Sequence, residues 1–319
     1  MAMDATPSLA SAWPDIPYLP WRETCTAFHL YTQIVGKYRL ARTPWINHSW
    51  HATLYVSARG LSTSIIPDGP GGIEITFDLI DHALVGAAAD GRTECFALAP
   101  MSVAAFHTRF RALIDALGGT SEFDGRPNEV ADPIPFIDDR AERPYDRDAV
   151  MRFFQALVQI DRVLKQFRTS YLGKVSPVHL FWGSFDMAVT RFSGRRAPLH
   201  PGGVPALPDE VTREAYSHEV SSAGFWPGGG AIDVPAFYSY AYPAPNGFSE
   251  ARVAPEAAYY STVLGEFLLP YDAVRQAKDP EAMLLAFLES TYAAAAKLGG
   301  WDRHELECLP GEPGRPRPL

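Results

Sequence analysis

Hydrophobic and polar positions in the first 120 residues change from helical to alternating spacing and then back to helical. Apolar residues at helical spacing predict a helix over 22–41, ending before Pro44. Strict alternation then predicts strands with one buried face. These strands cover 50–59, 61–66, 73–81 and 93–98. An apolar stripe predicts a second helix over 101–117, closed by two glycines.

The same order of elements returns in the second half of the chain. A helix is predicted over 147–171, because its apolar residues fall on one face. Strands are predicted at 178–192, 215–225 and 236–243, and helices at 255–275 and 280–298. Each half also ends in Leu-Gly-Gly, at 117–119 and at 298–300.

The repeated order predicts an α+β fold with an internal duplication, although coincidence would give the same pattern. We expect two similar antiparallel sheets with the same strand order, each carrying helices on one face. A strand at 121–130 would complete a TATA-binding-protein-like topology, which is fold analogy without functional force. The predicted organisation has four parts. They are an extended arm (1–20), a first half (21–120), a second half packed on it as one body (121–305) and a disordered tail (306–319).

Composition limits the class of protein. With 47% hydrophobic and 20% charged residues, the chain can form a sizeable core. A formal net charge of −9 opposes nucleic-acid binding, which needs clustered Lys and Arg. No apolar run is long enough to span a membrane, and the N-terminus does not read as a secretory signal. Three widely spaced cysteines without zinc-type spacing predict reduced thiols, a cytoplasmic protein and no metal site.

Residues 174–230 concentrate the side chains that build binding sites. This segment mixes tryptophans, histidines, arginines and glycine turns, which can form a pocket with an apolar wall and a few polar groups. In the predicted strand at 178–192, Trp182 and Asp186 share one face with Ser184 and Thr190. Asp186 could act as a base, or pair with a nearby arginine. No catalytic motif matches a defined mechanism.

Arginine and histidine supply the remaining candidates. Arg191 and Arg195 flank a glycine turn and could hold an anion, or could pair with Glu210, Glu214 or Glu219. His179 and His218 could be ligands or bases, or core histidines held by hydrogen bonds. In the first half, His51 and Arg59 share the polar face of the strand at 50–59. That face is either solvated or covered by a second layer that turns it into a cleft.

Several long motifs carry a resemblance. The most specific are Ser176-Pro-Val-His-Leu-Phe-Trp-Gly-Ser-Phe-Asp186, Thr190-Arg-Phe-Ser-Gly-Arg195 and Tyr216-Ser-His-Glu-Val-Ser-Ser222, with Gln33-Ile-Val-Gly-Lys37 in the first half. Together with further blocks over residues 13–305, they resemble a bacterial family of unknown function. The resemblance implies that 13–305 is one structural unit, and it implies no activity.

The leading functional hypothesis is a cytoplasmic small-molecule site between the halves, in an enzyme or a binding protein, with a small anionic ligand as partner. Its candidate residues are His51, Arg59, His179, Trp182, Asp186, Arg191, Arg195, His218 and Trp226. The alternative is a structural or interaction protein whose aromatic-rich segment is core or oligomer interface. Convergence of the polar side chains on one open cavity would favour the first. The sequence names no cofactor.

Overall fold

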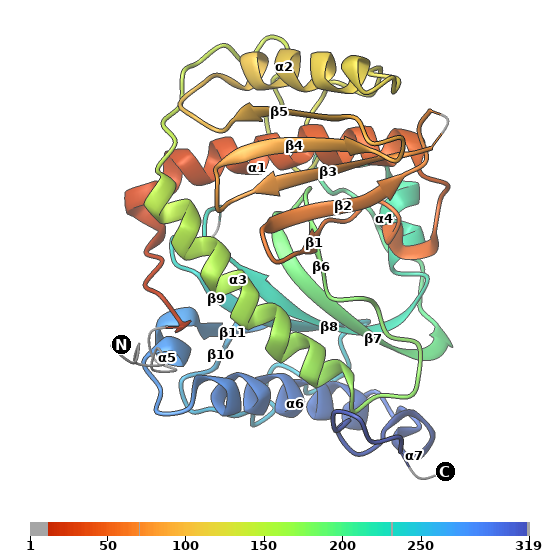
Figure 1. The fold of residues 1–319 in the computed structure, drawn as a ribbon. Helices are drawn as coiled ribbons and strands as arrows, with labels where there is room; N and C mark the ends of the chain where they lie inside the picture. The colour runs from red at the N-terminus through yellow and green to blue at the C-terminus, as the bar shows by residue number, and fades with distance from the viewer. Residues whose placement is uncertain (1–11, 70, 231, 318–319) are drawn as a thin grey trace.

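Two antiparallel sheets form the frame of the molecule (Figure 1). The computed structural model describes residues 12–69, 71–230 and 232–317. The first half contains α1 (Tyr18–Arg42), the short 3-10 helix η2 (Asn47–Ser49), β1 (Tyr55–Val56), β2 (Gly60–Ile66), β3 (Ile73–Asp78), β4 (Ala83–Ala88), β5 (Thr93–Ala97) and α2 (Val103–Ala116). These strands form a five-stranded meander in the order β1-β2-β3-β4-β5.

The second half builds a six-stranded sheet in the order β10-β11-β9-β8-β7-β6. Its elements are α3 (Arg147–Arg168), β6 (His179–Phe181), β7 (Asp186–Arg196), α4 (Asp209–Ala215), β8 (His218–Trp226), β9 (Ala236–Tyr242), β10 (Tyr259–Ser261), β11 (Glu266–Pro270), α5 (Tyr271–Arg275), α6 (Pro280–Leu298) and α7 (Arg303–Leu306). Leu54 and Leu180 exchange two backbone hydrogen bonds of 2.9 and 2.8 Å. This bridge joins the β1 edge of one sheet to the β6 edge of the other.

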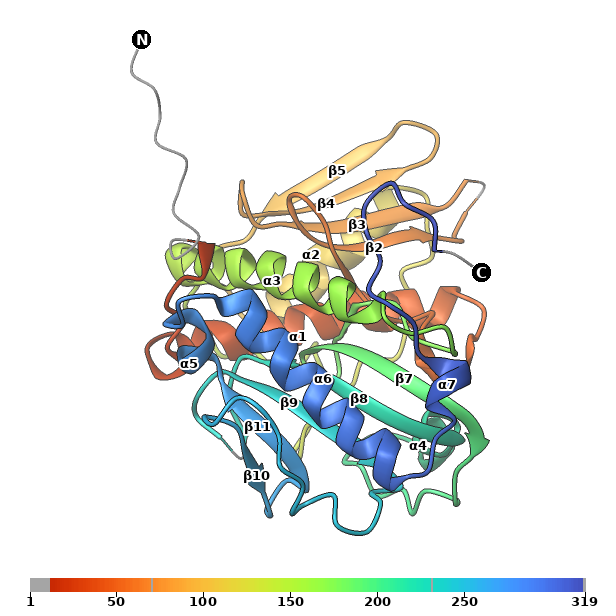
Figure 2. The same ribbon diagram turned by 90° about the horizontal axis from the view of Figure 1, so that it is seen from below.

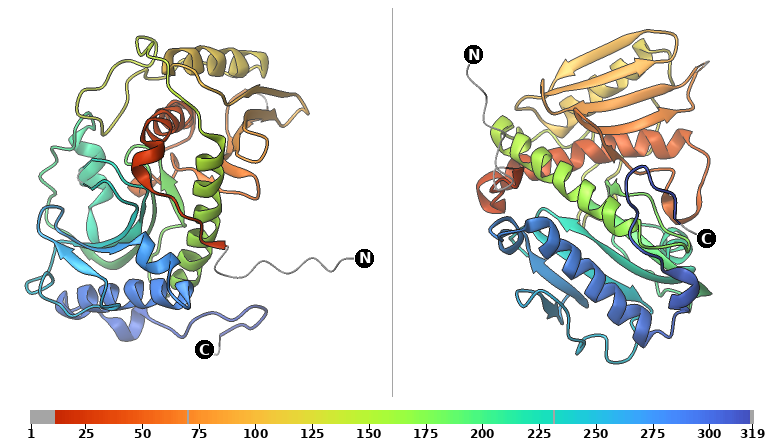
Figure 3. Two further views of the ribbon diagram at one scale, coloured as in Figure 1. Left: turned by 90° about the vertical axis from the view of Figure 1, so that its left-hand side faces the viewer. Right: turned by 60° about the horizontal axis from the view of Figure 1, so that its bottom comes forward.

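Helix α1 is a core element shared by both halves. Figure 3 (left) shows it end-on near the middle of the molecule, with α2 above it and α3 at its side. Residues on all sides of the helix are buried, from Trp21 to Tyr38. On the first sheet, Phe28 meets Phe77 edge-on with ring centroids 5.3 Å apart, and Phe77 stacks on Phe106 of α2. The core therefore depends on α1, which explains why its buried residues are not confined to one stripe.

Helices α3 and α6 cover one face of the six-stranded sheet (Figure 2). In β7, alternate residues point to opposite faces. Met187, Val189 and Arg191 point to the helix-covered face and are almost completely buried. Asp186, Ala188 and Thr190 point to the other face, where loops and α4 form the cover.

The α+β class and the two antiparallel sheets agree with the sequence prediction. The prediction of one strand order in both halves is wrong, because β11 lies between β9 and β10 while the first sheet is a simple meander. Residues 121–130 form no strand in the described chain. The TATA-binding-protein-like topology therefore lacks the element that would complete it, and the duplication stays a prediction.

Three local predictions are also corrected. Residues 50–53 are not strand: His48 and Ser49 adopt positive φ (62° and 58°), and carbonyls of the loop accept hydrogen bonds from side chains. The predicted strand at 178–192 is a hairpin, β6 and β7, that turns at 182–185. The predicted helix at 255–275 contains β10 and β11, because a short apolar run fits a buried strand as well as a helix. Strand β4 and helix α4 had no sequence prediction.

The two ends of the chain pack on the body where they are described. Trp13, Tyr18 and Trp21 are buried, as expected for anchors of the arm, and Tyr18 already opens α1. In the described part of the tail, the Cys308 N–H donates to the Ser170 carbonyl (3.2 Å) and the Gly311 N–H to Thr169 Oγ1 (3.0 Å), both at the end of α3. The expected disorder of the tail stays a prediction. Residues 1–11 and 318–319 lie outside the described chain. Over the described ranges, no helix has the length and apolar character needed to cross a bilayer.

Candidate functional site

A cavity of about 610 Å³ lies between the two halves. Its floor is the open face of the six-stranded sheet, with polar side chains from three neighbouring strands. They are Asp186 and Thr190 on β7, Ser222 on β8, and Tyr238 and Tyr240 on β9. Antiparallel pairing places these strands side by side, since Thr190 is opposite Ser222 and Ser222 is opposite Tyr240. The period of two explains why even-numbered residues face the cavity.

Hydrogen bonds link the floor into pairs. Thr190 Oγ1 lies 2.8 Å from Ser222 Oγ, and Tyr216 Oη lies 2.8 Å from Tyr240 Oη. The Asp186 carboxylate accepts hydrogen bonds from the hydroxyls of Ser184 and Tyr238. Burial raises the pKa of Asp186, and these two hydrogen bonds act in the opposite direction because they favour the charged form.

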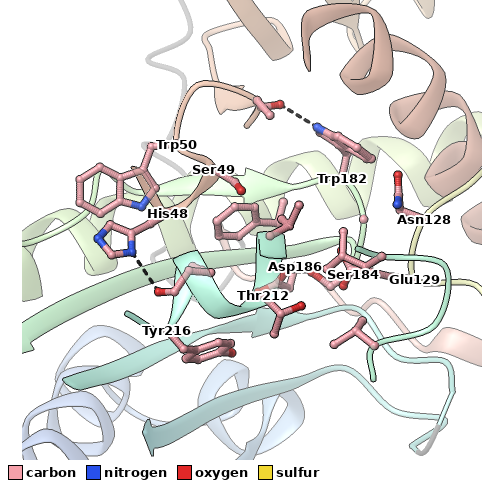
Figure 4. Close-up of a pocket in the computed structure, with 18 of the residues that line it drawn as sticks. His48, Ser49, Trp50, Asn128, Glu129, Trp182, Ser184, Asp186, Thr212 and Tyr216 are labelled. Atoms are coloured by element: carbon pink, nitrogen blue, oxygen red, sulfur yellow. Dashed lines mark hydrogen bonds between the residues drawn. The ribbon is translucent and has the colours of Figure 1, made fainter. Parts of the chain in front are cut away.

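Aromatic rings form the walls of the cavity (Figure 4). Trp45 and Trp50 come from the η2 loop of the first half, and Trp182 from the turn before β7. Trp182 is fixed, because its Nε1–H donates to the Ala52 carbonyl at 2.7 Å. Its indole also lies against Gly36 of α1, where an added Cβ would come within 2.3 Å of the ring. Glycine at position 36 therefore makes room for this wall.

Helix α1 also fixes the far rim. The side chain of Gln33 clamps Asn128 by accepting from its backbone N–H (2.8 Å) and donating to its carbonyl (2.9 Å). Lys37, one turn further along, pairs with Asp124 at 2.5 Å. Asn128 and Asp124 both line the cavity. Three positions of one helix, 33, 36 and 37, thus hold cavity walls that belong to the second half.

Glu129 follows the clamped residue and has unusual geometry. Its φ of 58° lies in the left-handed region, which is uncommon for a residue other than glycine. The carboxylate lies over Gly183, where an added Cβ would come within 2.0 Å of Oε1. Glu129 is an exposed residue by its accessible surface and lines the cavity, although many protein atoms lie around its carboxylate. Burial, with a smaller contribution from Asp186, raises the pKa of Glu129 to about 7.

The η2 loop is held against α4 by His48. Its backbone N–H donates to Glu214 Oε2 (2.7 Å), and its Nδ1 lies 2.9 Å from the Ala215 carbonyl. Because a carbonyl only accepts, Nδ1 carries the proton and Nε2 accepts from Lys174 Nζ at 2.6 Å. Burial lowers the pKa of His48, which favours the neutral imidazole that these hydrogen bonds require. This neutral joint positions Trp50 at the cavity.

The model of a family of unknown function, DUF5996, matches residues 13–308. The chain belongs to DUF5996. The match confirms the expected resemblance to a family of unknown function and covers nearly the same residues. No curated protein and no solved structure matches the chain. The cavity and its walls all lie within the matched part of this DUF5996 protein.

Of the nine residues predicted for the site, Trp182 and Asp186 line the cavity of the DUF5996 chain. Ser184 and Thr190, predicted to share their face, line it as well. The other candidates lie elsewhere. His51, Arg59, His179, Arg191, Arg195, His218 and Trp226 are not among the lining residues.

The two arginines have partners within the protein. Arg191 Nη2 donates to Ser170 Oγ at 2.9 Å and to the Phe167 carbonyl, on the helix-covered face. Arg195 Nη2 lies 2.7 Å from Glu219, one of the glutamates expected to compete with an external anion. Alternation explains the separation, because Asp186 and Arg191 are five residues apart in one strand and therefore face opposite ways.

The remaining candidates are also dispersed. Arg59 pairs with Asp78 and Asp81 beside the first sheet. His51 and His179 are buried, and burial with the nearby charge of Arg39 lowers the pKa of His179 to about 3. His218 lies 3.1 Å from Ser217 Oγ through Nδ1. Trp226 ends β8, while the cavity-lining residues of that strand are Val220 and Ser222.

Some lining residues had no sequence prediction. Glu129 lies in the segment before α3, and no local pattern marks it. Tyr238 and Tyr240 had a usable signal, since tyrosines alternate along β9 and therefore share one face. Within the described residues no group of histidine, cysteine and carboxylate side chains has the arrangement of a metal site.

Proposed function

We propose that this DUF5996 protein binds a small molecule in the cavity between its halves. The observation that carries the proposal is the cavity itself, because its volume of about 610 Å³ falls in the range of ligand pockets. Its aromatic and aliphatic walls and the few hydroxyl and carboxyl groups on its floor also match the usual composition of such sites. An enzyme and a binding protein both use a site of this kind.

The walls support the proposal because contacts within the protein fix them. Trp182 is held by Ala52 and Gly36, and the rim at Asn128 is held by both ends of the Gln33 amide. A preformed pocket loses little conformational freedom when a ligand enters, so more of the contact energy remains as affinity.

A cavity-filling substitution tests the proposal. Ala188 lies on the floor, in the middle of β7, so Ala188→Trp would occupy the cavity, and Ala188→Leu is a milder version should the tryptophan variant fail to fold. A library of neutral and charged compounds should contain members that raise the melting temperature of the wild type by mass action. We expect Ala188→Trp to abolish these shifts, and Ala257→Trp, at an exposed turn, to keep them. Shifts that survive in Ala188→Trp, or an absence of shifts in the wild type, would overturn the proposal.

A structural role is the second candidate, and it applies to the arginine segment. The contacts of Arg191 with Ser170 and of Arg195 with Glu219 support that reading. Sulfate or phosphate should then raise the melting temperature of the wild type and of an Arg191→Ala, Arg195→Ala double variant equally, relative to chloride at matched ionic strength. A larger shift in the wild type would instead support an anion site there.

We also propose a cytoplasmic location in a bacterial cell. Cys25, Cys95 and Cys308 are free thiols, which suits a reducing compartment. The net charge of −9 supports partners other than nucleic acid or an anionic membrane surface. Fractionation of cells that produce the protein at native level tests the location, and recovery in the membrane or secreted fraction would contradict it.

A further inference from the structure

The cavity lining carries more acidic than basic side chains. Its charged lining residues in the described chain are Lys37, Asp124, Glu129 and Asp186, and no arginine is among them. Lys37 is already paired with Asp124 at 2.5 Å. The carboxyl groups of Glu129 and Asp186 therefore remain without a basic partner in the lining.

The contacts of these two carboxyl groups confirm the imbalance. In the part of the chain that the structure describes, the Glu129 carboxylate has neither a hydrogen bond nor an ion pair. Asp186 accepts only from the neutral hydroxyls of Ser184 and Tyr238. Glu266, on β11, is a third acidic group close enough for Asp186 to contribute to raising its pKa to about 7, after burial. Asp186 is 9% exposed, and a buried carboxylate without a cation is unfavourable, so a positive charge placed beside it would gain more than it would in water.

Two hydroxyl groups also lack a partner at the cavity. Thr212 is 97% buried and lines the cavity (Figure 4). Its Oγ1 is hidden from solvent and has no hydrogen bond among the described residues. Ser49 Oγ, from the opposite wall, is in the same state. Buried hydroxyls are normally satisfied, so these two atoms are polar groups that a ligand would pair with only after the side chains rotate toward the cavity.

The walls suit a cation with an apolar body. Trp45, Trp50 and Trp182 line the cavity, and the negative face of an indole attracts an ammonium group while its area buries hydrocarbon. The Trp50 ring already has such a partner, because Lys174 Nζ lies 5.2 Å from its centre, so Trp45 and Trp182 are the rings left for a ligand. A free carboxylate ligand would instead meet the field of Glu129 and Asp186. The aromatic walls and the acidic floor thus favour the same ligand class.

We infer that the cavity binds an organic cation, a protonated amine carried on an aromatic or aliphatic body, with Glu129 and Asp186 as its counter-charges. The inference rests on the proposed function, since it names the ligand class of that same cavity. The ammonium group would donate to the two carboxylates, and the body would lie against the tryptophans.

The affinity should depend on pH in a defined direction. The groups facing Glu129 are Asp186 and Tyr216, with Asn128 and Gly183 beside it, and Lys37 and Asp124 lie further along the same wall. An ammonium ligand binds the ionised carboxylate, and the pKa of Glu129 in the free protein is about 7. Affinity should therefore rise between pH 6 and pH 8, and binding at pH 6 should release protons.

Calorimetric titration with matched probes tests the inference on the full chain. Three bodies (phenylethyl, indolylethyl and cyclohexylethyl) each carry an ammonium, a hydroxyl or a carboxylate group. We expect at least one amine to bind tenfold or more tightly than its alcohol, and its carboxylate not to bind. Glu129→Gln should reduce amine affinity about tenfold and leave the alcohol unchanged, while Glu256→Gln, which removes an exposed charge, should change neither. Asp186→Asn is the second variant and should act in the same direction.

The outcomes separate the inference from the proposed function. An alcohol or carboxylate that binds as tightly as its amine, and is lost in Ala188→Trp, would overturn the organic cation and leave the cavity as a binding site. Amine binding that is equal in wild type and Glu129→Gln, or that does not strengthen from pH 6 to pH 8, would also overturn it. If no probe of any charge binds, both the inference and the proposed function fail.

Discussion

The two faces of strand β7 differ in what surrounds their charged side chains. On the helix-covered face, Arg191 is 1% exposed, and its guanidinium carbon lies 3.5 Å from the ring centre of Phe167 and 4.3 Å from that of Tyr292. Arg191 Nη1 also lies 3.5 Å from Glu289 Oε2, although the Nε and Nη1 of Arg191 have no hydrogen bond among the described residues. On the cavity face, Asp186 has no cationic partner among the described residues, and neither has Glu129, which lines the same cavity from the segment before α3. The comparison teaches that a buried charged residue suggests a ligand site when the protein places neither an opposite charge nor an aromatic face against it.

The largest expected effect on stability comes from Arg191, on the helix-covered face of β7. Arg191→Ala would remove a large buried side chain and one of the donors to the Phe167 carbonyl. We expect a loss of about 3 kcal/mol in the free energy of unfolding, measured by urea denaturation. Arg191→Met keeps most of the volume and should lose less. A change below about 1 kcal/mol in Arg191→Ala would show that the helix-covered face does not depend on this residue.

The next largest effect on stability is expected at the cavity wall, where Gly36 makes room for Trp182. Gly36→Ala would place a Cβ within 2.3 Å of the Trp182 ring, which cannot swing freely while it is bonded to Ala52. Overpacking should lower the free energy of unfolding by about 1–2 kcal/mol, after the helix propensity of alanine offsets part of the strain. Stability and tryptophan fluorescence measure it. An exposed helical control, Thr108→Ala, should leave the fluorescence unchanged, and equal behaviour of both variants would contradict the packing account.

A smaller effect should appear with Glu129, and only at high pH. Its folded pKa of about 7 lies above the ordinary value of 4.5, so the folded state holds the proton longer than the unfolded chain. The presence of Glu129 therefore destabilises the fold progressively as pH rises from 4.5 through 7. Glu129→Gln should be more stable than wild type at pH 8, by about 1 kcal/mol or less because water in the cavity screens the charge. Calorimetric melting at pH 4.5 and pH 8 checks this, and equal stability differences at both would refute it.

The smallest effect concerns the tail that lies beside the helix-covered face. Ser170 binds Arg191 through its hydroxyl and Cys308 through its carbonyl. Deleting residues 308–319 removes mainly exposed contacts, so the melting temperature should fall by about 2 °C. A fall of more than about 6 °C would show that the tail is part of the support for Arg191, and an unchanged value would show that its contacts contribute nothing.

The sequence predicted the elements whose periodicity is long and clear. Helices α1, α3 and α6 and strands β8 and β9 lie within a few residues of their predicted ranges. The sequence predicted a helix where β10 and β11 form a hairpin, because the apolar run Phe267-Leu-Leu269 is too short to distinguish a helix from a strand. Pairing of β11 with β9 makes this run a strand. Residues 50–53 alternate between apolar and polar side chains as in a strand. The side chains of Arg39 and Trp182 donate to two carbonyls of this loop, so these carbonyls do not bond to a neighbouring strand.

The site was predicted only where one strand carried it. Trp182 and Asp186 share a face with Ser184 and Thr190, and strand parity alone places them together. The same parity separates Asp186 from Arg191, so that error was avoidable from the sequence. Glu129 was not predictable, because its place depends on a clamp from a helix 95 residues earlier.

That distance bears on how the chain folds during synthesis. Helix α1 is synthesised before the residues that it contacts in the second half. Asn128 follows Gln33 by 95 residues. Gly183, whose carbonyl lies 2.9 Å from the ring of His29, follows that histidine by 154 residues. Until then, the side of α1 that carries His29 and Gln33 has no partner, and closing such long loops is slow. A nascent first half would therefore expose this side of α1 to solvent, and exposed apolar surface of this kind favours association between chains during synthesis.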